Sequence, residues 1–214
     1  MKNFTLRISV TTRLLLSLAS GLMLFAAQYC SAENGVAQPD KTQQLIAAAV
    51  AQTQERVTYN GAYFKIAYPM GDVPAHYGVC TDVIIRAYRR LGIDLQQLVH
   101  EDMRKNFALY PAKKIWGQTK TDTNIDHRRV PNLQIFFTRH GKKLTISSKP
   151  QDYQVGDLVT WMLPGNLPHI GIVTDQFSAD GQRPLIVHNI GAGPQLEDML
   201  FDYNISGHYR YALF

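Results

Sequence analysis

The stretch "HYGVCTDVIIRAYRRLGIDL", residues 76–95, places a cysteine directly before an apolar stripe with helical spacing. The residues that recur on this stripe are Cys80, Val83, Ile84, Ala87 and Leu91. Their intervals match one face of an α-helix, and Gly92 provides a helix end. We therefore expect a helix with Cys80 in its first turn. Backbone N–H groups and the positive end of the helix dipole favour a thiolate at that position, which predicts alkylation below pH 7.

Helical patterns surround this stretch. Asp40 is a good N-cap for a helix whose inner face we expect to carry Leu45, Ile46, Ala49 and Val50. Asp94 can cap a third helix, "DLQQLVHEDMRKNF", and "NLQIFFTRHG" predicts a fourth, short one.

After Gly141 the pattern changes to short β-branched or aromatic runs separated by Gly, Pro, Asn and Asp. These runs are "KLTIS", "DLVTWML", "HIGIVTD", "PLIVHNI" and "GHYRYAL". Helices followed by strands predict the α+β class, with N-terminal helices packed on one side of an antiparallel sheet. No boundary divides residues 40–214, so we expect a single domain there.

The N-terminus has the layout of a secretory signal peptide. Basic residues precede an apolar run, "LLLSLASGLMLFAA", and small residues follow it in "QYCSAENG". We expect cleavage after Ala32, a linker over 33–39 and a periplasmic location. An uncleaved anchor and a lipoprotein modified at Cys30 are the alternatives. The run is short for a membrane span, so we expect no stable membrane insertion after cleavage.

Removal of residues 1–32 leaves 19 Lys and Arg against 17 Asp and Glu, a net charge of about +2. No basic run with interleaved aromatic residues remains, so nucleic acid is not an expected partner. Removal also leaves Cys80 as the sole cysteine in an oxidising compartment. Its retention has two explanations, burial as a small hydrophobe or nucleophilic catalysis, and its position alone does not decide between them.

Two histidines are candidate partners for the cysteine. His169 opens "HIGIV" and shares a strand face with Gly171, which we expect to leave room for a substrate or for the cysteine helix. His188 ends "PLIVHN" and could orient the His169 ring if the two strands pair. Either histidine could instead be an ordinary core residue.

These motifs together resemble a known superfamily. "CTDVIIRAYRRLGIDL" is similar to the cysteine helix of the NlpC-type cell-wall peptidases, which have a papain-like fold. "VGDLVTWMLPGNLPHIGIVTD" resembles their histidine strand, and "PLIVHN" the strand that carries the third polar residue. Within this superfamily, the chain more narrowly resembles the YijF-like periplasmic domain of unknown function, through "LVHEDM", "NIDHRRVPNL" and "HNIGAGPQLEDMLF". Thr81 and Asp82 stand where the superfamily commonly has Ser-Gly.

The resemblance implies an amidase or endopeptidase that cleaves peptidoglycan stem peptides. Cys80 would attack the carbonyl, His169 would transfer the proton, and His188 or Asn189 would orient the imidazole. We expect no cofactor. The positions that we expect to contact substrate are Tyr77, Asp82, Asp126, His127, Arg128 and Asn189. The arginines after His127 could bind a substrate carboxylate through bidentate hydrogen bonds, or cap the following helix.

Two rival functions remain open from the sequence. One is a catalytically silent binding module of the same fold. The other is a zinc peptidase, because several potential ligands occur: His76, Asp82, His100, Glu101, Asp102, Asp126 and His127. "HEDMR" does not have the His-Glu-x-x-His spacing, so we expect no metal site.

Overall fold

Helices occupy the first half of the described chain and strands the second. The computed structural model describes residues 40–211, and the expected signal peptide (1–32) and linker (33–39) lie outside the described residues. The α-helices are α1 (Lys41–Ala51), α2 (Cys80–Arg90), α3 (Leu95–Asn106), α4 (Ala112–Trp116) and α5 (Val130–His140). The 3₁₀ helices are η1 (Gln52–Gln54), η2 (Phe107–Leu109), η3 (Asp126–Arg128) and η4 (Pro150–Asp152). The strands are β1 (Thr58–Tyr59), β2 (Tyr77–Gly78), β3 (Lys142–Lys143), β4 (Leu158–Leu163), β5 (Leu167–Phe177), β6 (Pro184–His188), β7 (Gln195–Glu197) and β8 (Asn204–Arg210).

The four predicted helices are confirmed, and side chains cap two of them as expected. The Asp40 carboxylate accepts from the Gln43 N–H at 2.8 Å, and the Asp94 carboxylate accepts from the Gln96 N–H at 3.0 Å. Each satisfies one of the N–H groups that lack a partner at a helix start. Gly92 follows α2 with a φ of 76°, which glycine adopts without strain. The short helix α4 and strand β7 were not expected.

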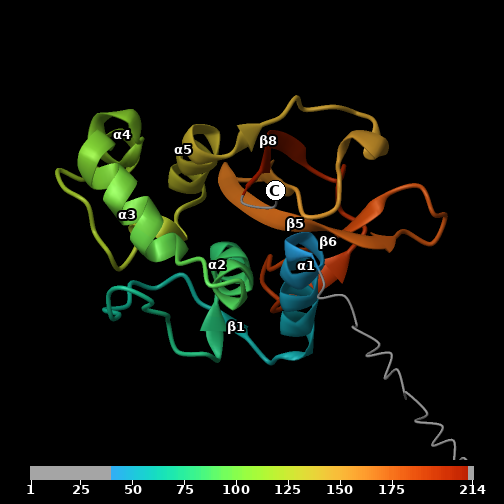
Figure 1. Ribbon diagram of the computed structural model, residues 1–214, viewed down its shortest axis with the longest axis horizontal. Coiled ribbons are helices and arrows are strands. Elements are labelled where there is room, and N and C mark those ends of the chain that lie inside the picture. Colours follow the sequence, from blue (N-terminus) through green and yellow to red (C-terminus); the bar gives the residue numbers. More distant parts are fainter. Residues whose placement is uncertain (1–39, 212–214) are drawn as a thin grey trace, which may run out of the picture. The chain divides into compact units, whose positions relative to one another are not determined.

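The main sheet has six strands in the order β3-β8-β4-β5-β6-β7, and every neighbouring pair is antiparallel. The helices α1, α2 and α5 contact its strands, and Figure 1 shows α1 and α2 beside β5 and β6. Strands β1 and β2 form a separate parallel pair just before α2. The chain is therefore an α+β protein with an antiparallel sheet, as predicted.

The sheet buries apolar side chains on both faces. Ile170 and Ile172 of β5 join the larger core cluster, which includes Cys80 and the apolar face of α2. Val173 and Trp161 belong to a second cluster on the opposite face. Trp161 donates its indole N–H to the Leu200 carbonyl at 2.9 Å, so the segment before β8 covers this face instead of a helix.

Helix α2 is buried almost all round. In addition to the predicted apolar stripe, Thr81, Asp82, Ile85 and Tyr88 are buried. The reason is that α2 contacts α1, α3, η3 and β5 at once. Its first turn is therefore enclosed in the domain, with consequences for the chemistry of Cys80.

Gly171 marks a close approach between β5 and β6. A Cβ atom at this position would lie 2.5 Å from Ile186 Cγ2 and 3.0 Å from the Val187 carbonyl oxygen. The room beside Gly171 is therefore filled by β6, and the expectation that it would admit a substrate or the cysteine helix is wrong. The missing side chain instead lets the two strands and their histidines come together.

The described residues, 40–211, all belong to one compact unit. Among residues 40–211, no helix is long and apolar enough to span a membrane.

We predict that Gly171→Ala lowers the free energy of unfolding by about 1–3 kcal/mol, because the added methyl group overpacks the β5–β6 contact. Urea denaturation measures this change. Gly61→Ala is the matched control, because its Cβ would have Val79 Cγ1 at 4.0 Å as its nearest neighbour. Equal stability of the two variants would contradict the close approach.

Candidate active site

Cys80 lies at the start of α2 and lines an open cleft with a volume of about 220 Å³. Its neighbours around the cleft come from the β1 segment, the loop after α4, the start of α5 and the start of β5. They include Tyr59, Gly61, Trp116, Arg128, Arg129 and Pro168. As the first residue of α2, Cys80 has a backbone N–H without an acceptor inside the helix. The cleft thus contains a sulfur atom and a hydrogen-bond donor side by side.

The thiol is neutral in the structure. Cys80 is only 5% exposed, and burial raises its pKa to about 12. The Asp82 charge also raises the pKa, whereas backbone N–H groups of Ile170, Thr81 and Cys80 lower it by a smaller amount. The expected thiolate is therefore not favoured, because desolvation outweighs the stabilisation by the helix N-terminus.

His169 and His188 form a hydrogen-bonded pair on one face of the sheet. Ile172 of β5 lies opposite Val187 of β6, so His188 faces Gly171 and lies diagonally from His169. The distance between His169 Nε2 and His188 Nδ1 is 3.1 Å. The structure thus brings together the two histidines that the sequence singled out.

The pair continues to a carboxylate that the sequence did not single out. His188 Nε2 lies 2.8 Å from Glu197 Oε2, in the neighbouring strand β7. His188 is buried, whereas the Glu197 side chain is 50% exposed. The result is a chain of three side chains that runs from the surface to His169.

This chain fixes the position of each proton. An ionised carboxylate only accepts hydrogen bonds, so His188 carries its proton on Nε2 and donates it to Glu197. His188 Nδ1 is then an acceptor, and His169 Nε2–H is its donor. His169 Nδ1 is left with a lone pair, which is the form that a general base requires.

Burial keeps both imidazoles neutral. Burial and, to a smaller extent, the neighbouring His188 lower the pKa of His169 to about 3. Burial also lowers the pKa of His188, although Glu197 opposes this shift. At physiological pH, His169 is therefore a neutral acceptor.

Cys80 packs against β5 on the sheet face that carries Ile170 and Ile172. The backbone of Ile170, the residue after His169, lowers the pKa of the Cys80 thiol, so it lies close to the sulfur. Among the hydrogen bonds of residues 40–211, none joins the sulfur to the His169 ring. The His169 ring shares its sheet face with Trp161 and Val173, so it points away from the face that packs against Cys80.

Asp82 and Arg128, two of the expected substrate-contacting residues, pair with each other. Arg128 Nε and Nη2 each donate to the Asp82 carboxylate at 2.9 Å, and both side chains are buried. Asp82 also accepts from the Val79 N–H at 2.7 Å. The ion pair therefore holds η3 against the first turn of α2, beside Cys80.

The other four expected positions lie away from the cleft lining. Tyr77 is half-buried in β2, and its carbonyl accepts from Arg86. Buried Asp126 accepts from the Gln118 amide. Asn189 donates to the Gly78 carbonyl at 3.4 Å, so His188 is the residue that contacts His169. His127 is buried, and its Nδ1 has no hydrogen-bond partner.

In residues 40–211, no group of three or more His, Cys, Asp or Glu side chains is arranged to hold a metal ion. Two of the potential ligands are engaged in other contacts. Asp82 pairs with Arg128, and Asp102 accepts from Tyr110 and Arg139. The described residues thus offer no zinc site.

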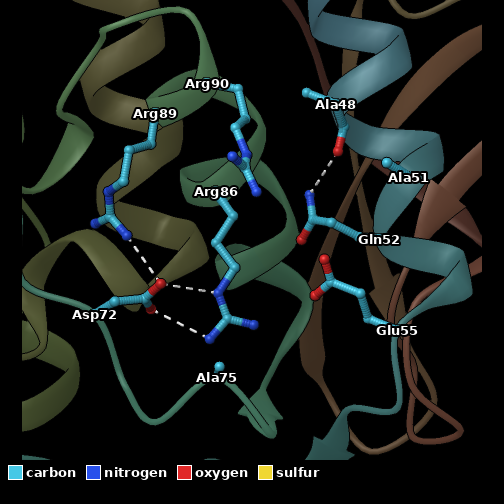
Figure 2. Close-up of a pocket in the computed structure, with 9 residues that line it drawn as sticks. All are labelled: Ala48, Ala51, Gln52, Glu55, Asp72, Ala75, Arg86, Arg89 and Arg90. Carbon is cyan, nitrogen blue, oxygen red and sulfur yellow. Dashed lines mark hydrogen bonds and ion pairs between the residues drawn. The ribbon is translucent and has the colours of Figure 1, made fainter.

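A second pocket, with a volume of about 630 Å³, lies between α1 and the later turns of α2. Figure 2 shows Arg86 and Arg89 directed at Asp72, with nitrogen–oxygen distances of 3.0 and 2.9 Å. None of its lining residues carries a thiol, hydroxyl or imidazole. These arginines anchor the loop that leads to Cys80, and we assign the pocket no chemistry.

Fold and site together define an α+β protein with a cysteine at a helix start and a paired histidine on the adjoining strand. The chain belongs to the family described as Domain of unknown function (DUF1287), whose model matches residues 46–211. It is similar to a protein of Escherichia coli (strain K12) described as uncharacterized protein YijF. The two are 57% identical over 153 residues, which cover 72% of this chain and 73% of that protein. Neither description names a reaction.

We predict that Asp82→Asn lowers the free energy of unfolding by about 3–5 kcal/mol, because it leaves the buried Arg128 guanidinium without its carboxylate. The double variant Asp82→Asn/Arg128→Met should be less destabilised than the sum of the single variants. Denaturation of all four proteins measures the coupling. Additive losses would show that the two side chains do not depend on each other.

Acid should destabilise the protein through its buried histidines. Burial lowers the pKa of His127 to about 3, so this imidazole stays neutral in the folded state, whereas it takes up a proton near pH 6.5 when unfolded. The contribution of His127 to the free energy of unfolding is complete above pH 6.5. It is lost by about 1.4 kcal/mol per pH unit as the pH falls towards 3.

We therefore predict that the free energy of unfolding falls less steeply between pH 6 and pH 4 in His127→Gln than in the wild type. His76→Gln, at an exposed position, is the control. Parallel curves for wild type and His127→Gln would contradict the assignment.

Proposed function

We propose that this protein is a cysteine hydrolase, an amidase or endopeptidase that cleaves peptidoglycan stem peptides. The observation that carries the proposal is the hydrogen-bonded chain His169–His188–Glu197, which ends in a neutral base on β5, the strand against which Cys80 packs. We further propose that the α+β domain has the papain-like fold of the NlpC-type enzymes. The predicted signal peptide would deliver the protein to the periplasm, where this substrate lies.

In the proposed reaction, Cys80 Sγ attacks the scissile carbonyl while His169 Nδ1 accepts the thiol proton. The chain through His188 holds the His169 ring in the accepting tautomer. The backbone N–H of Cys80 donates to the oxyanion, and one such donor lowers the barrier by about 3–4 kcal/mol. His169 then gives its proton to the leaving amine, and water hydrolyses the thioester with His169 again as base.

This mechanism begins from a neutral thiol and a neutral imidazole. Burial disfavours the thiolate–imidazolium pair, because both charged forms are poorly solvated in the first turn of α2 and on β5. Proton transfer must therefore accompany the attack on the carbonyl. It also requires the start of β5 to rearrange when substrate binds, because the His169 ring lies on the sheet face of Trp161 and must reach the face of the sulfur.

A second candidate function is a peptidoglycan-binding module without catalysis. The observation that favours it is the thiol itself, which is buried, has a pKa raised to about 12 and lacks a direct hydrogen bond to His169. Such a protein would use the same cleft for binding only. In residues 40–211, no arrangement of His, Cys, Asp and Glu side chains supports a zinc peptidase.

We predict that the wild-type protein releases peptide products from purified peptidoglycan, because the thiol and its base can form a thioester intermediate. Mass spectrometry of the soluble products measures the reaction. Cys80→Ala and His169→Ala should each abolish it, and EDTA should leave it unchanged.

Cosedimentation with intact peptidoglycan separates the two candidates. A hydrolase and its Cys80→Ala variant should both bind, but only the wild type should release products. Binding by both proteins without any product would support the silent module. The absence of both binding and product would contradict both candidate functions.

A further inference from the structure

Arg129 lies in the same cleft as Cys80, but its surroundings differ from those of Arg128. Arg128 is buried and engages a carboxylate through two nitrogens. Arg129 is half-buried, and among the described residues no carboxylate lies within ion-pair distance of it. One of two adjacent arginines is thus neutralised within the protein and the other is not.

The Arg129 side chain is held in place by neutral groups. Its guanidinium carbon lies 3.9 Å from the centre of the Trp116 ring, and its Nη1 donates to the Gln118 side-chain oxygen. Gly117, with a φ of 67°, ends α4 and forms the turn between these two residues. Stacking and this one hydrogen bond fix the orientation of the guanidinium plane without supplying a counter-charge.

The remaining donors of Arg129 match a carboxylate. A guanidinium has five N–H groups in a planar fork, and the Gln118 contact uses one of its nitrogens. Burial lowers the pKa of Arg129, while the charges of Asp126 and Asp122 act in the opposite direction without forming an ion pair with it. Asp126 is itself engaged by the Gln118 amide at 2.9 Å, so it is not directed at Arg129.

We propose that Arg129, held by Trp116 and Gln118, forms a subsite that binds a free carboxylate of the substrate beside the Cys80 thiol. The inference rests on the proposed hydrolase function and specifies its substrate class, an amide or peptide with a free carboxylate near the scissile bond. Arg129 is then a specificity-determining residue, and a neutral amide in place of the carboxylate is a poorer substrate.

Alkylation of Cys80 provides the test without a known substrate. The Cys80 thiolate displaces iodide from both iodoacetate and iodoacetamide, and the two reagents differ in carrying a carboxylate or a neutral amide. Their relative rate at pH 9 therefore reports the charge of the cleft and not the thiol pKa. Modification is followed by mass spectrometry of the peptide that contains Cys80, so that Cys30 does not contribute.

We expect the ratio of the iodoacetate to the iodoacetamide rate to exceed that of a free cysteine peptide in the wild type. Arg129→Gln should lower the ratio about fivefold, mainly through the iodoacetate rate. Arg90→Gln removes the same charge at an exposed position outside the cleft and should leave the ratio unchanged. An equal ratio in wild type and Arg129→Gln would overturn the carboxylate subsite.

The same experiment separates this inference from the proposed function. If neither reagent modifies Cys80 in the folded protein at pH 9, the thiol is not accessible from the cleft and the hydrolase fails. Trp116 fluorescence then tests the subsite by itself, through titration with N-acetylglycine and its neutral amide. Quenching by the acid alone, lost in Arg129→Gln, would support the carboxylate subsite, and no difference between acid and amide would overturn it.

Discussion

The contact between His169 and His188 is the interaction on which the candidate site depends. It exists because β5 and β6 pair in a register that puts both imidazoles on one face, and because Gly171 lets the strands approach. Glu197 in β7 then determines which ring nitrogen of His188 carries the proton, and His188 in turn determines this for His169. The pairing of three strands thus determines which ring nitrogen can act as a base.

Burial decides the charge state of the site. The helix start, which alone would favour a thiolate, lies inside the domain, and the nearby carboxylate is neutralised by Arg128. Cys80 and His169 are both uncharged as a result. In the oxidising compartment that the proposal assigns, a neutral thiol resists oxidation better than a thiolate, because the thiolate is the reactive species. The proposed enzyme would therefore generate its nucleophile only during attack on the substrate.

The sequence predicted those parts of the structure that depend on local patterns. The spacing of apolar residues gave the helix after Cys80, and Asp40 and Asp94 gave helix starts. Period-2 alternation placed His169 and His188 on compatible strand faces, so their pairing could be anticipated. The α+β class followed from the order of helices and strands.

Features that depend on long-range packing were not predictable in this way. Glu197 lies in a polar segment, and its role arises only from the β6–β7 register. Asp82 and Arg128 are 46 positions apart, so neither residue type nor spacing showed that they form an ion pair. The prediction of a thiolate at Cys80 was wrong for the same reason. Several elements bury the start of α2, and the sequence of the helix does not show this.

Nitrogen-15 NMR of the imidazoles tests the central claim most directly. His169 is assigned by comparison with His169→Gln, and its two ring nitrogens are followed from pH 5 to pH 8. We expect a neutral ring with its proton on Nε2 throughout this range, because the hydrogen bond to His188 and burial both favour that form. A proton on Nδ1, or a charged ring that titrates near pH 6.5, would contradict it.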